Sequence, residues 1–353
     1  MTIMKNRLLH IASGAIAAAA LMLTATGCIF EEPELTAEGE PGVDPTETVV
    51  TTDISLSLVL PSLEKGGEPF AVPPCAGTAY RRRTVVSAYA DGFPAVSKTV
   101  YSDIEQEGGS LDLSVALRLH ARAYNLAVWS DYVREQDGTT DGGYFYNIGR
   151  LPNIYMSTTY RGADNYKDAA CGYAAIDLSE FAGELGSHKK VEMALGRPVG
   201  RISYVATDAG AFLDRIASGA VKGGSFTVRV SYPGYLCMGY NVETSLLRHS
   251  LMYMKFEKAF KSADLEAGKP FTLAFDYLFA TADKAMEVPV RIDILDSAKE
   301  NVIATAAFNA FVRAGRTSTV SYSFLTSEAG EGVEIDPEFS GSETIVIPAR
   351  PTE

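Results

Sequence analysis

The stretch Asp53-Ile-Ser-Leu-Ser-Leu-Val-Leu60 places an apolar residue at every second position, so that Ile54, Leu56, Leu58 and Leu60 share one face. A period of two is typical of a β-strand that is covered on one side. Similar apolar runs predict further strands at residues 84–90, 110–119, 122–133, 171–178, 191–195, 201–206, 226–232, 271–279, 288–294, 302–312 and 317–325. No long alternation of strands with helices occurs. The chain is therefore predicted to be all-β and antiparallel, with one solvated face per sheet.

Three segments qualify this pattern. Residues 207–219 predict a short helix, with Thr207 or Asp208 as its cap and Gly219 at its end. We place a domain boundary after this helix, although a helix inserted in one larger sandwich would look the same. Pro289 lacks an N–H donor and indicates an edge strand or a bulge. Residues 246–260 are compatible with either strand or helix.

The first 28 residues carry an export signal. Lys5 and Arg7 precede an apolar run over residues 8–23, and Ala25-Thr26-Gly27 leads to Cys28. This order is typical of a secretory signal, and its end resembles the lipobox of bacterial lipoproteins. That resemblance implies a lipid on the sulfur of Cys28 and cleavage before it. The alternative is a retained signal anchor, but the run barely reaches the roughly 20 apolar residues of a spanning helix.

An acidic, proline-containing tether is expected over residues 28–52, because it has almost no large apolar residue with which to order itself. It resembles the signal that sends lipoproteins of Bacteroidota to the outer face of the outer membrane. The whole chain of 353 residues has a formal charge of −13. Without Lys5 and Arg7 the charge is −13 − 2 = −15, which argues against binding to nucleic acid.

Cysteine is scarce. With Cys28 assigned to the lipid, Cys75, Cys171 and Cys237 remain, an odd number that allows at most one disulfide within the chain. No CxxC pair occurs, so a zinc site is not expected. The domain plan is a signal at 1–27, the tether at 28–52, sandwiches at 53–220 and 221–325, and a tail at 326–353.

The tail ends in an apolar segment that contains Ile345 and Ile347. Such a strand could pair with its own sheet, or it could be donated to the open edge of another subunit.

Four segments together resemble Bacteroidota fimbrillin-like surface lipoproteins, and most closely a set of gut members without an assigned function. They are YNLAVWSDYV (124–133), YRGADNYKDAACGYAAIDLS (160–179), VEMALGRPVGRISYVATDAGAFL (191–213) and IDPEFSGSETIVIP (335–348). The resemblance implies two tandem transthyretin-like sandwiches in a pilus subunit, anchor or adhesive tip that assembles by strand exchange. It also implies that polymerising members lose an N-terminal strand to an arginine-directed protease, for which Arg81-Arg82-Arg83 is a candidate site.

Enzyme motifs are largely missing: the chain has no HExxH, GxSxG, Walker or GxGxxG motif. Ser62–Lys65 matches SxxK without its partner motifs, His120 is more consistent with a surface residue than a base, and Asp137 and Asp141 lack the spacing of a calcium loop. No enzyme, cofactor or metal is predicted. Tyr144, Tyr146, Tyr155 and Tyr160 lie in loop-like sequence with polar neighbours, which leaves glycan binding as the alternative function; packing of these rings onto the sandwich is the plainer interpretation.

Overall fold

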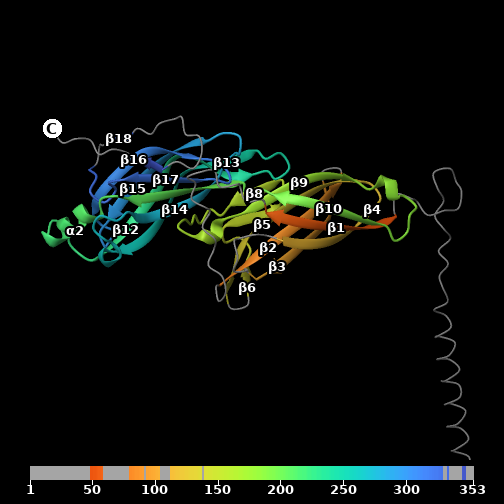
Figure 1. Cartoon of the computed structure of the whole chain (residues 1–353), viewed down its shortest axis with the longest axis horizontal. Helices are drawn as coiled ribbons and strands as arrows, with labels where there is room; N and C mark the ends of the chain where they lie inside the picture. Colours follow the sequence, from red (N-terminus) through yellow and green to blue (C-terminus); the bar gives the residue numbers. More distant parts are fainter. Residues whose placement is uncertain are drawn as a thin grey trace, which may run out of the picture.

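The computed structural model describes residues 48–58, 79–90, 93–103, 112–136, 139–328, 332–333 and 344–346. The signal, Cys28, Ser62–Lys65, Cys75, Asp137 and Ile347 lie outside these residues. The chain forms two β-sandwiches side by side along the long axis of the molecule (Figure 1). The regular secondary structure of the described part is mostly strand. Its helices are one α-helix, α2 (Ala209–Ala217), and the 3₁₀ helices η2 (Asn165–Lys167), η3 (Ser179–Phe181) and η4 (Ser262–Asp264). The all-β prediction is confirmed.

The N-terminal sandwich packs a three-stranded sheet against a larger one. The first sheet contains β10 (His188–Leu195), β1 (Val49–Leu58) and β4 (Asp112–His120), in that order. The second contains β3 (Phe93–Ser102), β2 (Tyr80–Ala90), β5 (Ala123–Gln136), β6 (Thr139–Asp141) and β9 (Ala170–Asp177). The alternation read from residues 53–60 is present, because Ile54 and Leu56 are buried in the core between these sheets.

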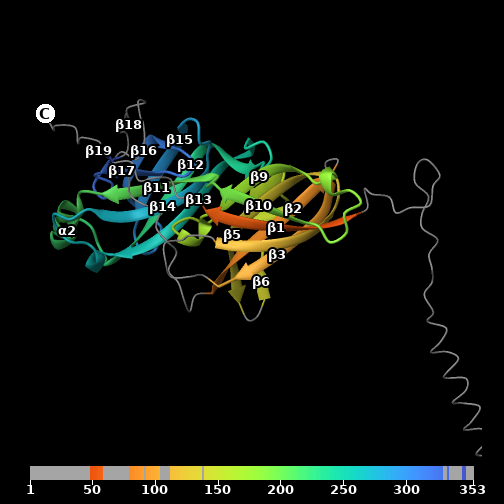
Figure 2. The ribbon, with the colours of Figure 1, turned by 45° about the vertical axis from the view of Figure 1, so that its right-hand side comes forward.

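The C-terminal sandwich has the same plan. One sheet contains β14 (Phe271–Phe279), β11 (Val199–Ala206), β17 (Thr317–Tyr322) and β19 (Thr344–Val346). The other contains β18 (Gly332–Val333), β16 (Val302–Val312), β15 (Met286–Leu295), β12 (Ser225–Tyr240), β8 (Asn153–Met156) and β7 (Tyr146–Arg150), with β13 (Leu247–Lys261) also on β12. Figure 2 shows the two sandwiches from a second side.

Both sandwiches contain parallel strand pairs, which differs from the antiparallel expectation. β1 runs parallel to β10 and antiparallel to β4, and β11 runs parallel to β17 and antiparallel to β14. Each of these parallel partners is far from the other in sequence, so the pairing follows from the fold rather than from any local pattern. The sheets are therefore mixed.

β5 forms a wall shared by two hydrophobic cores. Leu126 and Val128 face the core of the N-terminal sandwich, whereas Ala127 and Trp129 belong to the large core that continues through the C-terminal sandwich. Alternate residues of a strand point to opposite faces, and this explains why β5 is apolar on both sides, as its sequence predicts. Trp129 is fully buried and meets Tyr146 and Phe279 edge-on.

The strand pairing places β11, which precedes the predicted domain boundary, in the C-terminal sandwich. β11 and α2 precede the predicted boundary at residue 220, yet β11 pairs only with strands of the C-terminal sandwich among the described residues. The hairpin β7–β8 also crosses over, because Tyr155 and Ile154 pair with Gly239 and Tyr240 of β12. We propose that the division falls near Gly196 rather than at residue 220.

The helix and its cap differ in detail from the sequence prediction. Asp208 holds the N-cap position of α2, but its carboxylate accepts hydrogen bonds from the backbone N–H of Leu325 and the hydroxyl of Thr326 instead of capping the helix. Gly219 follows the helix with φ of +78°, a conformation that favours glycine. The carboxylate thus ties the helix start to the end of the last sheet.

Pro289 lies in an inner strand and not at an edge. β15 pairs with β16 along its length, but it pairs with β12 only over Arg291–Leu295. Pro289 is therefore beyond the β12 ladder and beside the register shift between Tyr232 and Tyr235. The proline ring lies against this bulge, because a Cβ built on Gly234 would be 2.7 Å from Cγ of Pro289. This agrees with the second of the two predicted possibilities.

Candidate functional site

The four tyrosines considered for ligand binding do not form one exposed face. Tyr146 is fully buried, and its hydroxyl donates to the backbone oxygen of Lys167 at 2.5 Å. The hydroxyl of Tyr160 donates to Oδ2 of Asp276 at 2.7 Å. Burial raises the pKa of both phenols well above the ordinary value, and Asp276 adds to the shift at Tyr160. These two rings hold the loop onto the sandwich.

The other two tyrosines lie apart. Tyr144 is half-buried, with the guanidinium of Arg161 at 4.1 Å from the centre of its ring. Tyr155 shares a hydrogen bond of 3.0 Å with Nε2 of His249 on β13. The structure thus brings Tyr144 to a cation–π contact and Tyr155 to the β12–β13 hairpin. The four tyrosines therefore do not form one exposed aromatic face, and a ligand role for them stays a prediction.

A buried polar cluster joins the two sandwiches. Asp276 on β14 accepts from Lys167, Tyr160 and Tyr232, and the ammonium of Lys167 lies 2.7 Å from Oδ1. Burial lowers the pKa of Lys167, and the charge of Asp276 opposes that shift. The charged and hydroxyl groups of the cluster are paired with one another, so we interpret it as a clamp between segments.

Two further buried ion pairs reinforce the N-terminal side of this junction. Arg197 contacts Asp168 at 2.9 Å, and Arg83 contacts Asp131 at 2.6 Å. Burial raises the pKa of each aspartate, and the neighbouring guanidinium opposes the rise. Such pairs contribute little net stability but are costly to break singly.

The basic triplet is part of a strand. Arg81, Arg82 and Arg83 lie in β2, between β3 and β5, and the last two are buried. Arg82 donates to the hydroxyl of Tyr132 at 2.8 Å. The partners that bury these cations come from β5, about 50 residues later, so the triplet alone gave no sign of its burial.

The remaining candidate residues are placed as follows. His120 is exposed at the end of β4, and Asp141 accepts from the backbone N–H of Gly143 within a turn. Cys171 and Cys237 are free, and burial raises the pKa of Cys171 to about 12. Ile345 lies opposite Val320 in the parallel β17–β19 pair. Across the described ranges no group of His, Cys, Asp or Glu could hold a metal ion, and no helix is long and apolar enough to cross a membrane.

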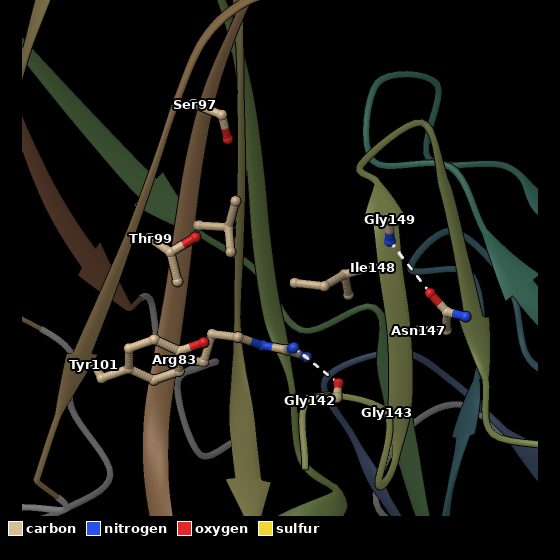
Figure 3. A pocket seen from close by; sticks show the side chains of 10 residues that line it. Arg83, Ser97, Thr99, Tyr101, Gly142, Gly143, Asn147, Ile148 and Gly149 are labelled. Carbon is tan, nitrogen blue, oxygen red and sulfur yellow. Dashed lines mark hydrogen bonds between the residues drawn. The ribbon is translucent and has the colours of Figure 1, made fainter. Parts of the chain in front are cut away.

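One pocket lies beside the exposed side chains of β3 and buried residues of its neighbour β2, opposite β7 and the turn before it. Its volume is about 490 Å³. Figure 3 shows Ser97, Thr99 and Tyr101 along one wall, with Ile148 and Asn147 on the other side and Arg83 reaching across to Gly142. The pocket could not be predicted from the sequence, because its two walls come from segments far apart in the chain, residues 97–101 and 142–149.

A second unusual surface lies on the β12–β13 hairpin. Five of the nine exposed large apolar side chains in the described residues are located there, and Tyr235 and Tyr253 are 74% and 72% exposed. The others are Leu246, Leu251 and Met252. β13 pairs with β12 alone among the described strands. We call these five residues the hairpin patch.

A family model, described as a family of unknown function (DUF6562), matches residues 45–348. The chain belongs to DUF6562. The match covers both sandwiches and extends from just before β1 to just after β19. No curated protein matches the chain in sequence.

Several solved structures are similar to this DUF6562 chain. A candidate cell adhesion protein from Bacteroides ovatus has 13% identity over 86% of this chain and 96% of that chain, with a TM-score of 0.39. A fimbrial assembly protein from Parabacteroides distasonis has 13% identity over 80% and 94%, with a TM-score of 0.35. The fimbrial anchor protein Mfa2 from Porphyromonas gingivalis has 9% identity over 73% and 82%, with a TM-score of 0.37. At these values the likeness does not transfer a function to this chain.

Proposed function

We propose that this chain is a lipid-anchored protein of the outer cell surface, held by Cys28, that serves a fimbria-like appendage as an anchor or tip and keeps its own first strand. The observation that carries the proposal is the position of β1. It lies in the middle of its sheet, paired with β10 on one side and β4 on the other. A shaft subunit of the fimbrillin-like kind would have to lose this strand.

Loss of β1 would be costly. Val50, Ile54 and Leu56 are at most 1% exposed and form part of the N-terminal core. Fully burying an aliphatic side chain is worth about 1.5–3 kcal/mol. The same cut would also release the chain from the lipid, because Cys28 precedes β1 by about 20 residues.

The basic residues offer little to an arginine-directed protease. Between β1 and β2, residues 59–79 contain Lys65 as their only basic side chain. The triplet that follows lies within β2, where Arg82 and Arg83 are buried. Proteases cleave exposed, mobile segments, so cleavage at the triplet would require β2 to separate from both neighbours.

Contact with other subunits is supported by two features. The hairpin patch exposes Tyr, Leu and Met side chains, and Tyr is enriched at the centres of protein interfaces. β19 pairs with β17 through only three register pairs, so we propose β17 as the edge where a neighbour's strand replaces β19. The partners proposed for this chain are other surface subunits, and we propose no catalytic activity.

The test uses the full chain in a bacterium that displays lipoproteins on its outer face. Cell fractionation and protease shaving should find the wild-type chain on the surface and in the membrane fraction, whereas Cys28→Ser should appear in the soluble fraction. Chemical crosslinking should give subunit adducts that Tyr253→Ser reduces and the exposed control Val302→Ser keeps. A Cys28→Ser chain that stays with the membrane, or crosslinks that do not depend on Tyr253, would contradict the proposal.

A further inference from the structure

We propose that the pocket between β3 and β7 is a binding site for a neutral saccharide. Its volume of about 490 Å³ falls in the range of about 300–1,000 Å³ typical of small-molecule sites. None of the four predicted tyrosine rings lines the pocket, although its second wall, residues 142–143 and 147–149, belongs to the loop that carries Tyr144 and Tyr146. The pocket contains no residue of the hairpin patch, and its function does not depend on the anchor role.

One wall is a regular face of two paired strands. Arg83 lies opposite Tyr101 and Val85 lies opposite Thr99 in the β2–β3 register. Because side chains of a strand alternate, Ser97, Thr99 and Tyr101 point to the same face, as Figure 3 shows. This wall therefore presents the hydroxyl of Thr99, the hydroxyl of Ser97, which also lies 2.8 Å from Oγ of Ser87, and the ring of Tyr101 in a row.

The arginine at the floor is held in one orientation. Arg83 donates from Nε and Nη2 to Asp131 at 2.9 and 2.6 Å, from Nη2 also to the oxygen of Tyr146, and from Nη1 to the oxygen of Gly142 at 2.8 Å. A guanidinium has five N–H donors, and the second N–H of Nη1 has no partner among the described residues. A side chain only 5% exposed thus keeps one donor for a ligand.

Gly142 lies directly beside the guanidinium of Arg83. A Cβ built on Gly142 would lie 3.0 Å from Nη1 of Arg83. The backbone can approach the guanidinium closely because the residue has no side chain. The opposite wall adds Asn147, whose Oδ1 accepts from the N–H of Gly149 at 3.3 Å. Its amide Nδ2 makes no hydrogen bond to any described residue and remains a donor.

Charge decides the class of ligand. Among the described residues, Arg83 is the only charged side chain that lines the pocket, and Asp131 balances it. An anion would gain no net attraction there, whereas a polyhydroxylated neutral molecule can both donate to and accept from hydroxyls and amides. Tyr101, which is 43% exposed, offers its ring to the apolar face of a sugar. A neutral saccharide fits all of these groups.

The experiment is saturation-transfer NMR on the full chain carrying Cys28→Ser, with cellohexaose, mannohexaose, xylohexaose and maltohexaose as neutral probes. Trigalacturonate and inorganic phosphate serve as anionic probes. At least one neutral probe should bind saturably, and Tyr101→Ala and Asn147→Ala should each weaken it about tenfold. Thr99→Trp, which fills the pocket from an exposed position, should abolish binding.

Tyr235→Ala is the matched control, because it removes an exposed tyrosine outside the pocket and should leave binding unchanged. Circular dichroism of each variant verifies folding. The proposal is overturned if no neutral probe binds, if only the anions bind, or if binding survives Thr99→Trp. Equal losses in Tyr235→Ala and Tyr101→Ala would also overturn it.

Discussion

The ammonium of Lys167 lies 2.7 Å from Oδ1 of Asp276, although the two residues are 109 positions apart and both side chains are almost fully buried. Lys167 belongs to η2, which follows the tyrosine loop, and Asp276 belongs to β14 of the C-terminal sandwich. Tyr160 and Tyr232 donate to Oδ2 of the same carboxylate. One aspartate therefore fixes the loop to the second sandwich.

Removal of this carboxylate charge should destabilise the protein strongly. Asp276→Asn leaves the ammonium of Lys167 buried without its counter-charge, and breaking a buried pair on one side costs about 3–5 kcal/mol. Urea unfolding should show this loss. The double variant Lys167→Met with Asp276→Leu should lose less than the single variant, because no charge is stranded. A single variant within about 1 kcal/mol of wild type would argue against a clamp.

Tyrosine burial predicts a fall in stability at alkaline pH. Burial raises the pKa of Tyr132 from 10.0 to about 12, so the folded state keeps a proton that the unfolded state releases. Stability is unaffected below pH 10 and falls as the pH rises from 10 to 12, by about 1.4 kcal/mol per unit for this one group. Urea unfolding at several pH values should show a smaller slope for Tyr132→Phe than for wild type. Equal slopes would mean that Tyr132 ionises in the folded protein.

Two glycines near the start of β11 make a matched pair. A Cβ on Gly200 would lie 2.3 Å from the backbone oxygen of Arg313, whereas a Cβ on Gly196 would have nothing within 4 Å. Gly200→Ala should cost about 1–3 kcal/mol through overpacking, and Gly196→Ala should stay within about 0.5 kcal/mol of wild type. Thermal unfolding distinguishes them. Similar losses in both variants would show that β11 does not pack as closely as described.

Truncation tests whether the last strand completes its own sheet. Deletion of residues 341–353 removes β19 and leaves β17 without a partner on that side. The melting temperature should fall by several degrees, because about 1 kcal/mol is lost per backbone hydrogen bond. The full chain should remain monomeric by analytical ultracentrifugation. Unchanged stability together with ladders of the intact chain would favour a donated strand.

Strands with one buried and one exposed face could be predicted from the sequence, because apolar residues then recur at every second position. Ile54 and Leu56 of β1 illustrate this. β3 was missed, since residues 95 and 97–99 are all exposed on a strand with little apolar pattern. β13 stayed ambiguous for the same reason, because residues 248–253 are exposed on both faces.

The candidate site was less predictable, because its contacts join distant segments. Nothing near Arg83 in the sequence indicates that Asp131 will neutralise it or that Gly142 will approach it. The tyrosine loop was recognised as a feature, but whether Tyr160 faces solvent depends on Asp276, which lies 116 residues away. Local patterns define elements, whereas long-range pairing defines which side chains remain accessible.

Retention of β1 can be read from the mass of the mature N-terminal peptide of protein recovered at the cell surface. We expect a lipid-modified peptide that begins at Cys28 and continues without a break through β1 into β2. An N-terminus within residues 59–84, with β1 absent from the surface form, would contradict it and would identify the chain as a processed, polymerising subunit.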